Sequence, residues 1–302
     1  MTTDANPIYF QGRSAEETQR LIDQAKLYDE HTRFLLQNAG VSAGMNVLDV
    51  GSGAGDVAFI AARLVGPTGS VIGVDQNPAV LETARARAEA MRLGNVRFIE
   101  SDIRTVDLPA DFDAAVGRLV LMYSADPVAT LKAVSDRVRP GGVIAFQEAD
   151  LPLARVDVAA RPLYGKFFDV ASAVFERAGV HGSMGTGLHR AFVDAGIGAP
   201  TMWAVIPMGG PAGWPGYGWF ASSFRSALPA IEQLGIATGA ELDVETLAER
   251  IEDEVVRTGL PLFATPHVCA WARKPPAPLP TSSTFILVVR PASWRKRRVF
   301  AS

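Results

Sequence analysis

The sequence predicts an α/β fold in which a doubly wound parallel β-sheet carries helices on both faces. Between residues 46 and 150, short apolar runs alternate with segments whose apolar residues recur every three or four positions. Alternation of strands and helices builds a parallel sheet of this kind. The turn after the first apolar run holds three glycines at every second position, which is typical of a ligand-binding turn. The 302 residues, 48% of them hydrophobic, suffice for one large domain.

Five strands are expected in this part of the chain, and turn or capping residues separate them. Gly66-Pro67 stops the helix after the first strand, and Asn77-Pro78 begins the next helix. Asp126-Pro127 begins the helix that precedes the fifth strand. The strands are predicted at residues 46–51, 70–75, 95–100, 113–121 and 143–150.

An amphipathic helix precedes the first strand. Its apolar positions step by four and three, which is the spacing of one helical face. The residues on this face are Leu21, Ala25, Tyr28, Thr32 and Leu35. We therefore expect residues 1–40 to form an N-terminal helical lid over a domain that spans residues 41–274.

After residue 150 the regular alternation ends, and residues 151–265 are expected to add helical cap elements that build a substrate pocket. Residues 211–235 hold three prolines, so a helix broken by turns is expected there. Within it, "GWPGYGWF" (213–220) sets aromatic residues between glycines and prolines, which favours a loop that lines the substrate. Helices are also predicted at 160–178 and 244–258, and strands at 201–208 and 267–273.

Composition narrows the classes of function. A proline-rich and basic tail at residues 275–302 is expected to be disordered. Without this tail, the chain has 24 basic and 32 acidic residues and a net charge of −8. An acidic body argues against a nucleic-acid-binding surface. Because Cys269 is the only cysteine, no internal disulfide can form, and no stretch of about 18 apolar residues is present. The sequence thus predicts a cytoplasmic protein without a membrane span, acting as a monomer or homodimer.

The glycine turn lies in "VLDVGSGAGDVA" (47–58) and indicates the kind of ligand. Gly51, Gly53 and Gly55 form GxGxG rather than the GxGxxG fingerprint of dinucleotide-binding proteins. Asp49 ends the strand below the turn, and Asp56 occupies the first turn of the following helix. Two carboxylates there would oppose a pyrophosphate, which helix N-termini otherwise attract. S-adenosylmethionine carries an ammonium and a sulfonium but no phosphate, so it fits better.

Two further strand ends complete a cofactor site. Asp75 ends the second strand, and a carboxylate there can accept two hydrogen bonds from a ribose diol. Asp102 follows the third strand and can accept from an adenine amino group, while Ile103 can pack on the adenine ring. Each signal alone is weak, but their order and spacing together favour S-adenosylmethionine.

These residues resemble a known family. "VLDVGSGAGDVA", "VIGVD", "FIESDI" and "RVRPGGVIAFQE" are similar to the motifs of class I S-adenosylmethionine-dependent methyltransferases, over roughly residues 40–150. The resemblance implies a Rossmann-like sheet of seven strands with the last one antiparallel. It also implies that Asp49 and the turn of Gly51, Ser52, Gly53 and Gly55 hold the methionine end of the cofactor.

The same resemblance assigns the remaining cofactor contacts. It places Asp75 and Gln76 at the ribose, and Asp102 and Ile103 at the adenine. Arg118 and Leu119, after the fourth strand, would lie beside the methyl and methionine groups, and Tyr9 and Gln24 in the N-terminal segment would close over the cofactor.

Missing motifs narrow the acceptor. The fourth strand runs into "GRLVLMY" rather than an Asn/Asp-Pro-Pro-aromatic turn, which disfavours the usual N-methylation of bases and amides. No cluster of acids or cysteines indicates a catalytic metal. A general base is required only if the acceptor must lose a proton. The candidates are His181 and His189, which flank a glycine-rich loop, and Tyr123 beyond the fourth strand; His31 and His267 are expected to be structural.

We therefore expect a metal-independent methyltransferase that methylates an O, N or C atom of a small organic metabolite. One alternative keeps the cofactor but assigns an RNA or protein acceptor recruited by the basic tail. A second is a non-catalytic regulator that binds S-adenosylmethionine. An NAD-dependent oxidoreductase is the least favoured alternative because the glycine pattern differs.

Overall fold

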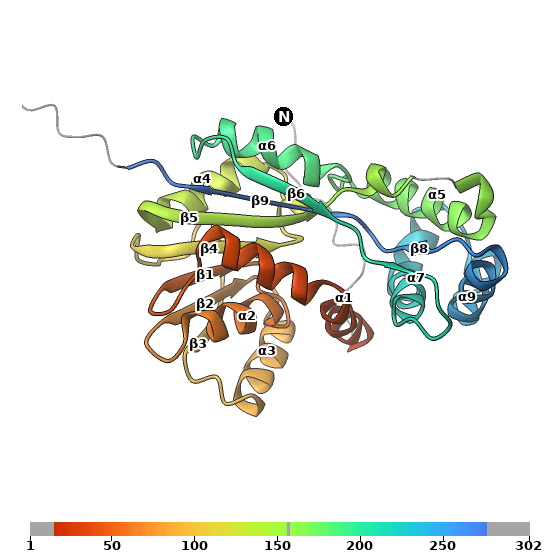
Figure 1. Ribbon diagram of the computed structural model, residues 1–302, viewed down its shortest axis with the longest axis horizontal. Coiled ribbons are helices and arrows are strands. Elements are labelled where there is room, and N and C mark those ends of the chain that lie inside the picture. The colour runs from red at the N-terminus through yellow and green to blue at the C-terminus, as the bar shows by residue number, and fades with distance from the viewer. Residues whose placement is uncertain (1–14, 156–157, 277–302) are drawn as a thin grey trace, which may run out of the picture.

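The computed structural model describes residues 15–155 and 158–276, and its centre is a seven-stranded sheet (Figure 1). The strand order is β3-β2-β1-β4-β5-β9-β6. Every neighbouring pair is parallel except those of β9, which runs antiparallel to both β5 and β6. The predicted fold class, with its antiparallel last strand, is confirmed. The strands are β1 (Asn46–Val50), β2 (Ser70–Asp75), β3 (Val96–Glu100), β4 (Phe112–Arg118), β5 (Val138–Ala149), β6 (Thr201–Val205) and β9 (His267–Arg273).

Helices cover both faces of the sheet, and the side chains of β5 alternate between the two apolar layers. Val143 and Ala145 pack in the layer under α1, α2 and α3, whereas Ile144 and Phe146 pack in the layer under α4 and α6. This two-sided burial is what a doubly wound sheet requires. The helices are α1 (Ala15–Ala39), α2 (Asp56–Val65), α3 (Pro78–Ala90), α4 (Pro127–Arg137) and α6 (Met184–Asp194).

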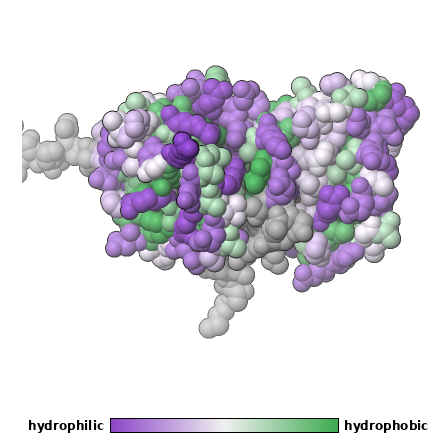
Figure 2. Space-filling model, turned by 90° about the horizontal axis from the view of Figure 1, so that it is seen from below, coloured by the Kyte–Doolittle hydropathy of each residue, from purple (hydrophilic) through white to green (hydrophobic). Residues whose placement is uncertain are grey.

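A smaller group of helices lies beyond the end of the sheet where β5 stops and β9 begins (Figure 1). These helices pack on one another and on the first half of α1. The face seen in Figure 2 is mostly hydrophilic, with a hydrophobic strip near the boundary between sheet and helices. The group consists of α5 (Pro162–Arg177), α7 (Gly216–Gln233), α8 (Gly239–Leu242) and α9 (Leu247–Thr258), with the short strands β7 (Met208–Gly209) and β8 (Leu262–Phe263).

Two predictions about this region are corrected. The expected broken helix is one continuous helix, α7, which keeps Pro229 inside it. Burial of Trp219, Phe220 and Phe224 along one side outweighs the unfavourable proline. The strand expected at 201–208 ends at Val205, because Met208 pairs with Phe263 in a separate two-stranded sheet.

Other boundaries shift for local reasons. The fourth strand ends at Arg118, and the residues up to Tyr123 form the 3₁₀ turn η1 (Leu121–Tyr123). Two further 3₁₀ turns, η2 (Leu151–Ala154) and η3 (Val158–Ala160), follow β5. Across the parts of the chain that the structure describes, no helix is long and apolar enough to cross a membrane.

Candidate functional site

The glycine turn after β1 opens onto a cavity of about 370 Å³ at the carboxyl ends of the strands. Gly51, Ser52 and Gly53 line it. Gly51 (φ +62°) has no room for a side chain, since a Cβ would lie 2.6 Å from Val120. Gly53 (φ +50°) differs, because nothing lies within 4 Å of where its Cβ would be. The space over Gly53 therefore allows a ligand to approach the backbone closely.

Gly55 and Asp49 support the turn from behind and do not line the cavity. A Cβ on Gly55 would lie 2.5 Å from the Phe59 ring, so this glycine is required for packing. Asp49 is fully buried, and neither carboxylate oxygen has a hydrogen bond of normal geometry to a described residue. Burial raises the pKa of Asp49 well above its ordinary value, against the opposing charge of Arg118. The direct ligand contacts implied for both residues are not supported by this placement.

Asp75 connects the second strand to the glycine turn. Its Oδ2 accepts from the backbone N–H of Gly53 at 2.9 Å, and its Oδ1 accepts from the N–H of Asn77 at 2.9 Å. Each carboxylate oxygen keeps a second lone pair for a ligand. The neighbouring hydroxyl of Ser52 is buried and has no partner among the described residues. A polar ligand over this turn would therefore find both an acceptor and a free hydroxyl.

The third strand end supplies one wall of the cavity. Asp102, Ile103 and Gln76, three residues of the predicted cofactor site, all line it. Asp102 is held by Arg104, whose Nη2 donates to Oδ2 at 2.6 Å, and this contact lowers the pKa of the Asp102 carboxyl. Ile103 is buried and offers an apolar surface beside that carboxylate. The wall thus combines a hydrogen-bond acceptor with an apolar platform.

Helix α1 forms the opposite wall through Arg20, Leu21 and Gln24. Arg20 is buried and donates to Glu17 through two nitrogens, each at 2.7 Å, and to Oε1 of Gln24 at 2.7 Å. The hydrogen bond from Arg20 fixes the orientation of the Gln24 amide and leaves its NH₂ group available to a ligand. Tyr9, predicted to close over the cofactor, lies outside the described residues.

The charge of the cavity differs from the one inferred from the sequence. Asp56 lines the cavity, but Nη2 of Arg87 lies 2.7 Å from its Oδ1 and compensates the charge. Arg118 also lines the cavity and pairs with Asp29 at 3.0 Å. Arg87 thus offsets the charge of Asp56, and Asp49 does not line the cavity, so their negative charge explains ligand choice less well than the sequence suggested. The shape of the glycine turn and the position of Asp75 carry more weight.

The loop after β4 is held in an unusual conformation. Leu119 has φ +58°, which is rare for a residue with a side chain. Buried Glu148 accepts from the N–H groups of Val120 (3.0 Å), Leu121 (2.8 Å) and Met122 (3.3 Å). Burial raises the pKa of Glu148 to about 7 despite these hydrogen bonds. No sequence motif pointed to Glu148, which fixes the loop that divides the site.

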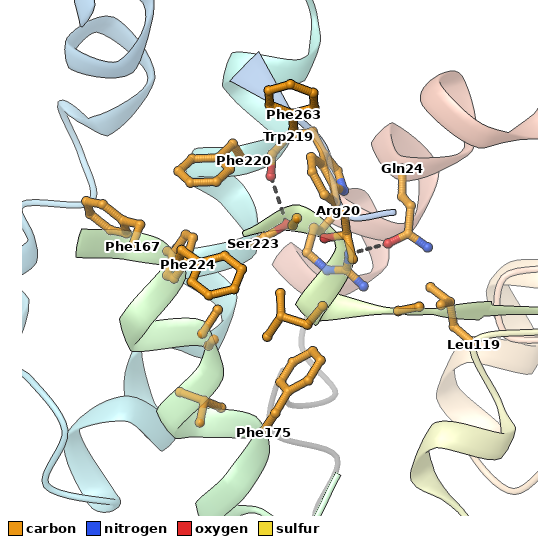
Figure 3. A pocket seen from close by; sticks show the side chains of 18 of the residues that line it. Arg20, Gln24, Leu119, Phe167, Phe175, Trp219, Phe220, Ser223, Phe224 and Phe263 are labelled. Atoms are coloured by element: carbon orange, nitrogen blue, oxygen red, sulfur yellow. Dashed lines mark hydrogen bonds between the residues drawn. The ribbon is translucent and has the colours of Figure 1, made fainter. Parts of the chain in front are cut away.

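A second cavity of about 120 Å³ adjoins the first and is largely aromatic (Figure 3). Side chains of α5 and α7 form most of it, including Phe167, Phe175, Trp219, Phe220 and Phe224. Both cavities are lined by Arg20, Gln24, Leu119 and Tyr123, so these four residues form their common boundary. Of the aromatic residues in "GWPGYGWF", Trp219 and Phe220 line this pocket, from a helix rather than from a loop, whereas Trp214 and Tyr217 do not line it.

The three predicted base candidates lie in different places. Tyr123 lines both cavities, and burial raises its pKa, so it stays protonated at neutral pH. His181 is exposed, and its Nε2 lies 2.9 Å from the carbonyl oxygen of Ser124. His189 is exposed on α6. Neither histidine lines the two cavities, whereas His267, expected to be structural, lines the aromatic one.

Potential metal ligands are not gathered in this site. In the described ranges, no group of three or more His, Cys, Asp or Glu side chains could hold a metal ion. Cys269 is buried in β9, where burial raises the pKa of its thiol to about 12.

Sequence comparisons agree with this geometry. A sequence model of the methyltransferase domain matches residues 41–176. A ubiquinone/menaquinone biosynthesis C-methyltransferase UbiE from Pseudomonas putida is 30% identical over 145 residues, covering 47% of this chain and 54% of that protein. A 37.1 kDa protein of transposon TN4556 from Streptomyces fradiae is 30% identical over 199 residues, covering 66% and 52%. The chain thus spans about half the length of the curated relatives it matches.

Solved structures show the same fold at low sequence identity. The YcgJ protein from Bacillus subtilis has a TM-score of 0.52 at 17% identity, covering 82% of this chain and all of that one. The 4+2 cyclase SpnF has a TM-score of 0.50 at 17% identity, covering 82% and 81%. The matched domain, the sheet order and the glycine turn agree with one another. Residues 41–176 match the methyltransferase domain, and the sheet order and glycine turn agree with a class I S-adenosylmethionine-dependent methyltransferase.

Proposed function

We propose that this chain transfers a methyl group from S-adenosylmethionine to an O, N or C atom of a small organic acceptor. The observation that carries the proposal is the shared boundary of the two cavities at Leu119 and Tyr123. A polar cavity beside the glycine turn meets an apolar one, so a cofactor and an acceptor can lie next to each other there.

The residues of the larger cavity fit this cofactor. The open space over Gly53, the free Ser52 hydroxyl and the carboxylate of Asp75 suit the amino-acid and ribose parts, and Ile103 suits the adenine. When bound, S-adenosylmethionine supplies a methyl group on a positively charged sulfur. The chain itself has to align the acceptor and exclude water, and alignment alone can contribute about 7–11 kcal/mol. Because Leu119 and Tyr123 line both cavities, the proposal assigns this alignment to them.

An aromatic pocket of about 120 Å³ supports a small acceptor over a macromolecular one. Phe167 is fully buried, and Phe220 and Phe224 pack against it with ring centroids 5.9 and 4.6 Å away. A nucleic-acid acceptor would need a basic surface instead. The relatives named UbiE are C-methyltransferases, which makes carbon one of the acceptor atoms worth testing.

Calorimetry with S-adenosylhomocysteine and with NADH tests the cofactor. We expect binding of the former and no heat from NADH; the opposite result would overturn the proposal. A metabolite screen with S-adenosylmethionine labelled on the methyl group then tests the transfer. Label moving to RNA or protein, and lost on removal of residues 275–302, would support the macromolecular alternative. SpnF has this fold and is named a cyclase, so binding without any methyl transfer would indicate another role for the site.

A further inference from the structure

The aromatic pocket contains one histidine whose position the sequence did not reveal. His267 is 1% exposed and lines the pocket, because β9 begins beside Ala149, the last residue of β5. Its ring stacks on Tyr28, with centroids 3.8 Å apart and planes inclined by 11°. The imidazole is therefore held in one orientation by packing.

A chain of hydrogen bonds favours one ring nitrogen of His267 as the carrier of the proton. Oγ1 of Thr32 accepts from Arg118 at 2.9 Å and lies 2.8 Å from Oε1 of Gln147 and 3.1 Å from the carbonyl oxygen of Tyr28, and we assign its proton to the shorter contact. With the Gln147 oxygen assigned toward Thr32, its Nε2 faces Nδ1 of His267 at 2.9 Å. An amide nitrogen can only donate, so Nδ1 is the acceptor and the proton of the neutral ring lies on Nε2.

The surroundings also keep this ring neutral. Burial is the main cause that lowers the pKa of His267 well below its ordinary value, and the positive charge of Arg118 and a smaller effect of His31 act in the same direction. The closest charged network pairs Arg118 with Asp29. Tyr28, the other titratable group packed on the ring, has its pKa raised by burial and stays protonated.

The N–H at Nε2 of His267 has no hydrogen-bond partner among the described residues, and neither has the buried Nε1–H of Trp219, which lines the same pocket. Trp219 also contacts Tyr28, with ring centroids 6.0 Å apart. Of the other polar groups here, Tyr164 donates to the carbonyl of Ala154 and Ser223 to that of Trp219, whereas Gln24 lies at the boundary with the larger cavity. Two free donors in an apolar pocket match a ligand atom that offers lone pairs.

We infer that His267 binds the acceptor directly: its Nε2–H donates a hydrogen bond to an oxygen of an otherwise apolar, ring-sized molecule such as a phenol or an enolisable ketone. This inference rests on the proposed function and specifies its acceptor. Among the described lining residues of this pocket there is no Asp or Glu, so an ammonium would have no counter-charge. A neutral imidazole can hold an oxygen without carrying charge itself.

Paired probes test the inference by binding rather than by turnover. p-Cresol and p-xylene have nearly the same shape and differ by a hydroxyl, and their dissociation constants are measured on protein loaded with S-adenosylhomocysteine. We expect His267→Phe to weaken p-cresol binding roughly five- to tenfold and to leave p-xylene binding unchanged. His267→Gln keeps an N–H donor and should restore most of the loss. His189→Phe, on the exposed side of α6, is the matched control and should change neither constant.

Three results would overturn the inference: no p-cresol binding to wild type, equal effects of His267→Phe on both probes, or an unchanged p-cresol constant. If S-adenosylhomocysteine itself does not bind, the proposed function fails instead.

The wild-type protein gives a second test that needs no variant. ¹⁵N NMR of histidine-labelled protein should show His267 protonated at Nε2 only, from pH 6 to pH 8. A proton on Nδ1, which would make Nε2 a base, or an imidazolium would contradict the inference.

Discussion

The two cavities of this protein are built in different ways. The larger one consists of turns at strand ends, where backbone N–H groups, Gly53 and Asp75 present polar atoms. The smaller one consists of side chains from α5 and α7, which present aromatic rings. Backbone geometry can hold a ligand that many proteins share. Side chains, which vary freely by substitution, can hold an acceptor that is specific to one protein. The predictions below separate the two regions, from the largest expected effect to the smallest.

Removing a central ring should damage the aromatic region most. Phe167→Ala is expected to lower the free energy of unfolding by about 3–5 kcal/mol, because it leaves a cavity among Phe220 and Phe224. Chemical denaturation measures this loss. Phe34→Ala removes the same side chain at a position that is 55% exposed and should cost far less. Calorimetry on folded Phe167→Ala should find S-adenosylhomocysteine affinity close to wild type; a large loss would mean that the regions are not separable.

Two glycines of one turn should respond differently to the same substitution. Gly55→Ala is expected to lower the free energy of unfolding by about 2–4 kcal/mol, because the new Cβ meets Phe59 in addition to the strained φ of +92°. Gly53→Ala is expected to lower the free energy of unfolding by about 1–2 kcal/mol, because only the backbone strain of the positive φ applies there. Its methyl group enters the cavity, however, and should weaken S-adenosylhomocysteine binding. Urea unfolding and calorimetry on both variants measure the contrast, and equal stability losses would contradict it.

Glu148 should make stability depend on pH. Its pKa is raised to about 7 in the folded protein from 4.5, so the folded state binds the proton more tightly than the unfolded state. Its contribution to stability is therefore fully present below pH 4.5 and is lost as pH rises toward 7, by up to about 3 kcal/mol. Urea unfolding of wild type and Glu148→Gln across this range isolates the effect, because other groups cancel in the difference. A difference that stays constant with pH would refute this assignment.

The smallest effect is expected at Asp75, the proposed ribose ligand. Asp75→Asn keeps one carbonyl oxygen but loses the charge, and should weaken S-adenosylhomocysteine binding by about tenfold. Asp113→Asn changes an acid of β4 that accepts from the N–H of Asn46, away from both cavities, and serves as the control. Calorimetry compares the two; equal losses would argue against a ligand role for Asp75.

The sequence predicted the larger cavity well because its determinants are local. Each strand end was visible from a short apolar run followed by Gly51, Asp75 or Asp102, and parallel pairing brings such ends to one edge. The predicted ligand contacts that this placement does not support also rested on local patterns. Gly55 and Asp49 have the expected residue types, but they pack toward the protein interior.

The aromatic cavity could not be predicted to the same degree because distant segments meet there. Pro229 and the glycines before Phe220 suggested a broken segment, whereas packing against α1 and α9 maintains one helix. His267 seemed structural from its strand context, and only the insertion of β9 beside β5 brings it to the pocket. His181 seemed close to the acceptor in the sequence but turns to the carbonyl of Ser124.

The position of β9 also has a consequence for biosynthesis. This strand is the last of the sheet to leave the ribosome, yet it lies between β5 and β6. Until residues 267–273 emerge, both neighbours expose an unpaired edge, the kind of surface that joins strands of other chains. Nascent chains of this protein should therefore depend on chaperones until that final strand has been synthesised.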